Sequence, residues 1–204
     1  MNLGPIVLQG HHLRLEPLSP AHEEALLKVS GDGGIWSWMS ADLSDRGALR
    51  RWIEQAVADE AAGVSYAFAV IDMNTGRTVG STRYLNIESH DLGVEIGWTW
   101  YTPEVWGTRI NPEAKLLMLT HAFEDWGALR VALRTDHLNA HSQAAIRKLG
   151  AQYEGTLRNH RVRRDGTIRH TLVFSIIRAE WPDVKERLTR RVTAPDVEKP
   201  ERAD

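Results

Sequence analysis

The order of apolar and polar residues divides the chain into short strands and amphipathic helices. Residues 12–16 alternate between apolar and polar side chains, a pattern typical of a half-buried strand. Ser19-Pro20 predicts a helix start, because serine caps free N–H groups and proline fits the first helical turn. A second helix, capped by Ser44 or Asp45, is expected to end near residue 62.

Strands and helices then follow in an order that indicates the fold class. Further strands are expected at residues 66–71, 78–85, 92–101, 129–135, 153–163 and 168–177. Helices are expected from residue 111 onward, with His121 in its middle, and at residues 139–149 and 180–191, with Asn111 as N-cap of the first. Antiparallel hairpins thus flank a strand–helix–strand crossover, which predicts an α/β (α+β) domain with a mixed sheet and helices on both faces.

Two segments have less regular patterns. The apolar run 35–39, with Trp36 and Trp38, lies between chain breakers, and two roles stay open for it: lining a binding cleft or filling the core. The charged, proline-containing tail 193–204 is expected to be disordered, which leaves residues 1–192 as one domain.

Composition narrows the class of protein. The 204 residues suit one domain, and no apolar run reaches the roughly 18 residues of a membrane span. Cysteine is absent, which excludes a disulfide framework, a thiolate zinc site and a cysteine nucleophile. No secretory signal is visible, so the expected location is cytoplasmic. No metal site is expected, because the nine histidines are scattered.

Charge is unevenly distributed along the chain. The formal net charge is −2, so no overall field favours nucleic acid. Residues 129–170, however, carry nine Arg or Lys against three acids. They are either solvated faces or a surface that meets a polyanionic cofactor or an acidic partner.

Residues 95–178 carry a set of short motifs in a fixed order. They are Glu95-Ile96-Gly97-Trp98, Thr102-Pro103-Glu104-x-Trp106-Gly107, Asn111-x-Glu113-Ala114-Lys115, His121-Ala122-Phe123-Glu124, Asp136-x-x-Asn139-x-x-Ser142-Gln143, Leu149-Gly150-Ala151 and Arg164-Asp165-Gly166. Together they resemble the GCN5-related N-acetyltransferase (GNAT) superfamily, within it the ribosomal-protein N-terminal acetyltransferase branch. The resemblance implies a GNAT fold, with six to seven strands and a V-shaped splay between the fourth and fifth strands.

The resemblance also implies a site for acetyl-CoA (coenzyme A). Its arm would lie in the splay, and its pyrophosphate on the turn and helix start after the fourth strand, where N–H groups converge. The implied cofactor-binding residues are Ile96, Gly97, Trp98, Trp106, Gly107, Thr108, Arg109, Asn111, Asn139 and Ser142. The loop lacks the second small residue of the usual family pattern, and Arg109 offers phosphate a charged contact instead.

Amine acetylation needs a base, an oxyanion donor and a proton for the leaving thiolate. Glu95 is the candidate base, although a salt-bridged strand carboxylate explains it equally well. Ser142 is the candidate donor to the thiolate, because the tyrosine that many family members use is missing. Asn139 and Ser142 also suit a helix N-cap and first turn, and both roles can hold together. His121, His141 and His170 are alternative acid–base groups.

The expected function is acetyl-CoA-dependent transfer of acetyl to a primary amine, with the N-terminal amine of a (ribosomal) protein as one acceptor. A small amine or antibiotic as acceptor remains open, as does an acyl-CoA-binding protein without catalysis. A third alternative is a ribosome- or RNA-binding module, which the near-neutral charge disfavours. No nucleic-acid or membrane partner is expected, and a homodimer is left open. Asp42 and Asp45 are candidate attractants for a cationic amine.

Overall fold

The structure, a computed structural model, describes residues 6–194. In this part of the chain, eight strands form one sheet: β1 (Leu8–Gln9), β2 (Leu13–Pro17), β3 (Ser65–Asp72), β4 (Thr78–Glu88), β5 (Gly93–Tyr101), β6 (Arg130–Asp136), β7 (Gln152–Val162) and β8 (Ile168–Ile177). The α-helices are α1 (Glu23–Val29), α2 (Arg46–Ala61), α3 (Ile110–Thr120), α4 (Ala140–Leu149) and α5 (Trp181–Thr193).

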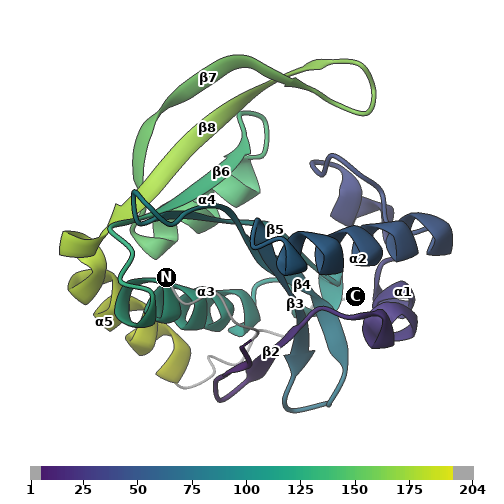
Figure 1. Ribbon diagram of the computed structural model, residues 1–204, viewed down its shortest axis with the longest axis horizontal. Helices are drawn as coiled ribbons and strands as arrows, with labels where there is room; N and C mark the ends of the chain where they lie inside the picture. Colours follow the sequence, from purple (N-terminus) through teal and green to yellow (C-terminus); the bar gives the residue numbers. More distant parts are fainter. Residues whose placement is uncertain (1–5, 195–204) are drawn as a thin grey trace, which may run out of the picture.

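The sheet is mixed, as the element order predicts. Its strand order is β1-β2-β3-β4-β5-β6-β8-β7, and β5 with β6 is the parallel pair. Helix α3 makes the crossover between these two strands. Figure 1 shows the long β7–β8 hairpin curving away from the body of the sheet and arching toward the segment between α1 and α2.

Each face of the sheet has its own core, because alternate strand residues point to opposite faces. On β3, Phe68 and Val70 pack into the core that α3, α4 and α5 cover, whereas Ala67 and Ala69 pack against α1 and α2. The expectation of helices on both faces is therefore confirmed. We call these the α3 face and the α2 face.

Strands β5 and β6 separate soon after they begin. Their parallel pairing extends only from Gly93–Glu95 on β5 to Arg130–Ala132 on β6. Beyond Glu95, β5 continues to pair with β4, and β6 continues to pair with β8. This is the expected V-shaped splay, between the fourth and fifth strands in the sequence-based count and between β5 and β6 in the complete sheet.

Several local predictions are confirmed. Asp45, one of the two predicted caps, caps α2 by accepting from the Ala48 N–H at 2.9 Å, and the expected last helix is α5. Trp36 fills the core of the α2 face, with its indole N–H donating to the Ser30 carbonyl, so the core role holds for this residue. The tail prediction falls mainly on residues 195–204, which lie outside the described part.

Two local predictions are wrong. The sheet has eight strands rather than six to seven, because the two-residue β1 is too short to show an alternating pattern. Helix α3 begins at Ile110, so Asn111 is its second residue rather than its N-cap. Arg109 occupies the N-cap position without a capping side chain, and the Ile110 N–H donates to the Thr108 hydroxyl at 3.3 Å.

Candidate active site

Glu95 is the last β5 residue that pairs with β6, and its side chain lies on the α2 face. The residue is 7% exposed. Its Oε2 accepts a hydrogen bond from the Asn86 side chain at 2.9 Å and lies 3.2 Å from Nε of Arg134 on β6. Burial raises the pKa of Glu95, and the nearby arginines and Asn86 only partly offset that effect. A buried carboxylate with a raised pKa suits proton transfer.

Immediately after Glu95, β5 contains a bulge. Arg83 of β4 pairs with Gly97 and Ser81 pairs with Trp100, so β5 has one more residue than β4 in this interval. Trp98 has φ of +47°, a left-handed conformation that is strained for a tryptophan. The bulge reverses which residues face α3: Ile96 does so before it, and Tyr101 after it.

The turn between β5 and α3 contains the predicted phosphate-binding residues. Trp106 is 45% exposed, and its indole N–H donates to the Tyr101 carbonyl at 2.9 Å. Gly107 has φ of +76°, and no atom lies within 4 Å of the position that a Cβ would take, so the turn needs glycine for its backbone rather than for space. The Arg109 side chain points toward His12, with Nη1 3.5 Å from Nε2.

Unpaired polar groups at the start of α3 fit an anion there. Among the described residues, no acceptor receives the N–H of Gly107 or Asn111. The Asn111 Oδ1 is enclosed without a hydrogen-bond partner. Because the two ends of an amide are hard to distinguish, a flipped Asn111 would present its NH₂ donor instead. Helix-start N–H groups with a nearby amide donor are suited to a phosphate group.

Helix α4 begins after the carboxyl end of β6. The Asn139 Oδ1 accepts from the Ser142 N–H at 2.9 Å, so the N-cap role of Asn139 is confirmed. Ser142 is the third helical residue and is partly exposed. Helix α4 packs on the α3 face, whereas the Glu95 side chain lies on the α2 face. The two predicted catalytic residues therefore lie on opposite sides of the sheet, beside the same opening between β5 and β6.

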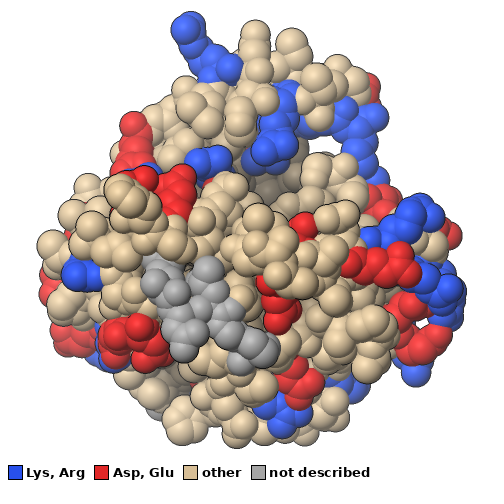
Figure 2. Space-filling model, in the orientation of Figure 1, with Lys and Arg blue, Asp and Glu red and all other residues tan. Residues whose placement is uncertain are grey.

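The β7–β8 hairpin covers the α2 face beyond Glu95. Its turn reaches across to the segment between α1 and α2: Arg164 is 3.0 Å from Oδ2 of Asp42, and its Nη2 donates to the Trp36 carbonyl at 2.8 Å. Figure 2 shows a hollow under the hairpin, with Lys or Arg side chains along its upper edge. Of the two acids that were candidate attractants for an amine, Asp42 is paired with Arg164, and Asp45 caps α2.

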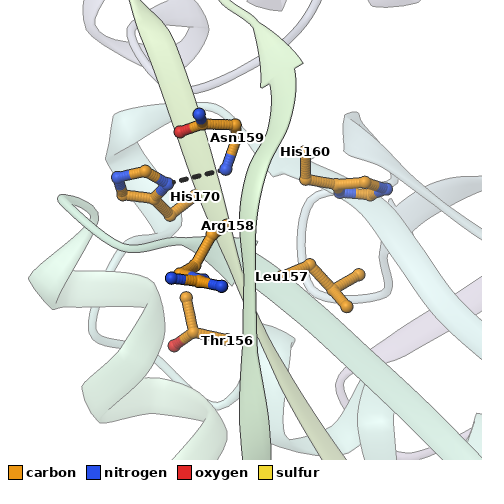
Figure 3. Close-up of a pocket in the computed structure, with 6 residues that line it drawn as sticks. All are labelled: Thr156, Leu157, Arg158, Asn159, His160 and His170. Atoms are coloured by element: carbon orange, nitrogen blue, oxygen red, sulfur yellow. Dashed lines mark hydrogen bonds between the residues drawn. The ribbon is translucent and has the colours of Figure 1, made fainter.

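A separate open hollow of about 840 Å³ lies along the hairpin itself, at a bulge in β7. Its lining consists of Thr156, Leu157, Arg158, Asn159, His160 and His170. Figure 3 shows Leu157 and His160 on one side of the hairpin and Asn159 on the other, with the Asn159 N–H donating to Nδ1 of His170 at 2.9 Å. Apart from His170, none of the predicted site residues lines this hollow.

The three alternative histidines have different environments. His121 is buried in a π-helical turn (His121–Asp125) with Nδ1 2.6 Å from Asp125, which is a packing role. His141 is exposed on the first turn of α4 beside Ser142. His170 lies on the hairpin, its ring 4.5 Å from that of His137.

The sequence-based site missed the groups that hold Glu95 in place, Asn86 and Arg134. Arg134 had a visible signal, since it and Arg130 lie at even positions of β6, whereas the apolar Val131 and Leu133 lie at odd positions. That pattern places Arg134 on the face away from the α3 core. Nothing in the sequence around Asn86 indicates its contact with Glu95, because the contact depends on the register of β4 with β5.

The family model of the acetyltransferase (GNAT) domain matches residues 12–152, which include the splayed strands and both helix starts. The chain belongs to the GNAT acetyltransferases. The bulge after Glu95, the opening between β5 and β6 and the start of α3 all lie within the matched residues. No helix in residues 6–194 is long and apolar enough to cross a membrane.

Solved structures share this GNAT fold over nearly the whole chain. A GCN5-related N-acetyltransferase from Brucella melitensis is 25% identical, with a TM-score of 0.88 over 94% of this chain and 87% of that one. A candidate acetyltransferase from T. thermophilus is 34% identical, with a TM-score of 0.84 over 94% of this chain and 100% of that one. A comparison with curated proteins gave no match.

A third structure is RimJ of Mycobacterium smegmatis, solved in complex with CoA-disulfide. It is 20% identical, with a TM-score of 0.78 over 92% of this chain and 93% of that one. At this level of identity the similarity concerns the GNAT fold alone.

Proposed function

We propose that the protein transfers the acetyl group of acetyl-CoA to a primary amine, namely the N-terminal amine of a peptide or protein. The observation that carries the proposal is the position of Glu95: a buried carboxylate of raised pKa where β5 and β6 begin to diverge. An alkylammonium must lose a proton before it can attack a thioester, and Glu95 is placed to accept that proton.

The residues around Glu95 have supporting roles in this proposal. Asn86 and Arg134 both contact its Oε2, which fixes the carboxylate and leaves Oε1 for the amine or for an intervening water. Beyond Glu95, the backbone groups of β5 that point toward β6 have no ladder partner. They are available to an acceptor or cofactor carbonyl, and the bulge at Trp98 is the candidate oxyanion donor.

The proposed cofactor fits the α3 and α4 helix starts. Gly107 and Asn111 would hold the pyrophosphate, with Arg109 as a charged neighbour, and Asn139 and Ser142 would lie along the arm. Acetyl-CoA would supply the activated acetyl group and the thiolate leaving group. RimJ of Mycobacterium smegmatis, solved with CoA-disulfide on the same fold, supports coenzyme A as the ligand.

The experiment combines binding with turnover. Calorimetric titration with acetyl-CoA should show binding that Asn139→Ala weakens. Glu95→Gln should keep acetyl-CoA affinity but lower kcat by about 100-fold or more, the usual size of a lost general base. A matched control is Glu154→Gln, which removes a carboxylate from the same face of the sheet at a residue paired with Arg130.

The pH profile gives an independent readout. Because burial raises the pKa of Glu95, the acid limb of wild-type kcat/KM should lie above the ordinary glutamate pKa of 4.5. Activity falls below that limb because a protonated Glu95 cannot accept a proton. Acetyl-CoA binding without turnover on peptides or small amines would instead show a non-catalytic acyl-CoA-binding protein. Unchanged turnover in Glu95→Gln would eliminate Glu95 as the base.

A further inference from the structure

Three arginines surround Glu95 on the α2 face, and the proposed reaction does not require all of them. Arg134 is 3.2 Å from Glu95. Arg169 of β8 and Arg161 of β7 are paired residues across the hairpin. Paired residues of neighbouring strands point to the same face of the sheet, and so do residues of one strand that are an even number of positions apart. Arg134 of β6 pairs with Val173 of β8, and Val173 is four positions from Arg169. The three guanidiniums therefore share one surface with Glu95.

The other acids on this surface are already neutralised. Asp136 is buried and receives two hydrogen bonds from Arg163, at 2.7 and 2.9 Å. Glu154 is paired with Arg130. Arg161 is exposed and has no hydrogen-bond or ion-pair partner among the described residues. Arg169 also lies 4.0 Å from Asp136. Five arginines (Arg130, Arg134, Arg161, Arg163 and Arg169) thus share this surface with three carboxylates (Glu95, Asp136 and Glu154), which leaves an excess of two positive charges.

The field of these arginines also reaches neighbouring groups. Arg161 and Arg169 act on Glu95 in the direction that lowers its pKa, against the larger effect of burial. The pKa of His160, on the same side of the hairpin, is lowered by burial and then by Arg161, Arg134 and Arg169. Positive potential therefore extends from Glu95 along the hairpin, over a surface that no helix covers (Figures 1 and 2).

We propose that the acceptor amine carries a carboxylate a few residues away, which binds the surface formed by Arg134, Arg161 and Arg169 while the amine lies at Glu95. This inference rests on the proposed acetyl transfer and names its substrate class: peptides with an acidic residue near the N-terminus. A polycationic amine, such as a polyamine, would meet net repulsion on its way to Glu95.

The geometry sets where the acidic residue should lie. Arg134 lies 3.2 Å from Glu95, and Arg161 and Arg169 are near enough to act on the pKa of this carboxylate. An extended peptide advances about 3.3–3.6 Å per residue. With the reach of the arginine side chains included, a carboxylate at peptide position 2, 3 or 4 can contact this surface. We therefore expect the preference to depend on position and to be absent for an acid far from the amine.

The test uses three sets of amidated hexapeptides that share their N-terminal residue and carry Asp, Asn or Lys at position 2, 3 or 4. For the wild type, kcat/KM should favour Asp over Lys by about tenfold or more, as expected for charge pairs at a partly exposed site. The preference should shrink between low and high salt, because the Debye length falls. Arg161→Glu should abolish or reverse it.

The control is Arg190→Glu, which makes the same change of charge on α5, where Arg190 is highly exposed on the opposite face. It should leave the preference unchanged. Equal use of Asp and Lys peptides by the wild type, or equal effects of the two substitutions, overturns the inference. The Asn peptides carry no charge at the varied position, so their acetylation tests the proposed acetyl transfer separately from the charge preference. If no peptide is acetylated, the proposed function fails, and calorimetric binding of the same peptides still decides the charge preference.

Discussion

Lys115 of α3 is buried under the sheet and allows a quantitative test of the structure. The residue is 5% exposed, its ammonium donates to Thr99 at 2.7 Å and to Thr82 at 3.3 Å, and no carboxylate of residues 6–194 is in contact with it. Burial lowers the pKa of Lys115 from 10.5 to about 7. Replacing it with Met keeps an unbranched side chain of similar length, and the Thr82 and Thr99 hydroxyls remain 2.7 Å apart as partners.

The magnitude follows from the change in pKa. Between pH 7 and 10.5 the unfolded chain holds a proton on Lys115 that the folded protein lacks, so wild-type stability rises with pH in this window. The slope is roughly 1.4 kcal/mol per pH unit. The cost of the buried lysine is therefore largest below pH 7. Lys115→Met should be the more stable protein there, and its advantage should shrink by about 2 kcal/mol between pH 7 and pH 9.

The assay is urea unfolding of both proteins at pH 6, 7, 8 and 9, followed by tryptophan fluorescence. Taking the difference between the two proteins removes the contribution of the other titrating groups. Lys148→Met, on the exposed side of α4, is the matched control and should show no such trend. A stability difference for Lys115→Met that stays constant within about 0.5 kcal/mol across this range would refute the reasoning.

Two further substitutions test buried polar contacts. A Cβ on Gly10 would lie 2.5 Å from Oε1 of Glu113, whose carboxylate accepts two backbone N–H groups of the turn before β2. Gly10→Ala should thus lower the free energy of unfolding by about 1–3 kcal/mol, whereas Gly31→Ala, with open space around it, should not. Arg83 stacks on Trp52 with Nε and Nη2 enclosed and unpaired, and burial lowers its pKa to about 10. Arg83→Met should raise the free energy of unfolding by about 1 kcal/mol, because removing the cost of burying the charge outweighs the lost cation–π attraction. A decrease of that size, measured by thermal unfolding, would contradict the prediction.

The features that could be predicted from the sequence depend on neighbours in the chain. The cap of α2 at Asp45 and the cap of α4 at Asn139 were predicted correctly, because a cap bonds residues two or three positions away. The Asp165-Gly166 turn was also predicted, since Gly166 adopts the positive φ that such hairpin turns need. Family motifs extended these local predictions to the fold and the splay.

The sequence-based predictions were wrong where contacts with other residues, rather than the local pattern, decide the structure. Asn111 has the ideal chemistry for an N-cap, but Arg109 occupies the N-cap position of α3, and the Asn111 side chain is enclosed in the first turn. Strand β1 forms through its pairing with β2, although its own two residues carry no pattern. The Glu113 carboxylate binds the N–H groups of His11 and His12 in the turn between these strands, a contact that spans about 100 positions in the sequence.

The sequence by itself determined the α-helices, every strand except β1, the order of these elements, the family and the candidate base Glu95. Only the tertiary structure decided that Glu95 is buried, that Asn86 and Arg134 hold it, and that Asp42 and Asp45 are already engaged. It also decided that Arg134 and the two paired arginines of the hairpin share one surface with Glu95. The reason is physical: burial and charge depend on distances across the sheet, and strand register sets those distances between residues far apart in the chain.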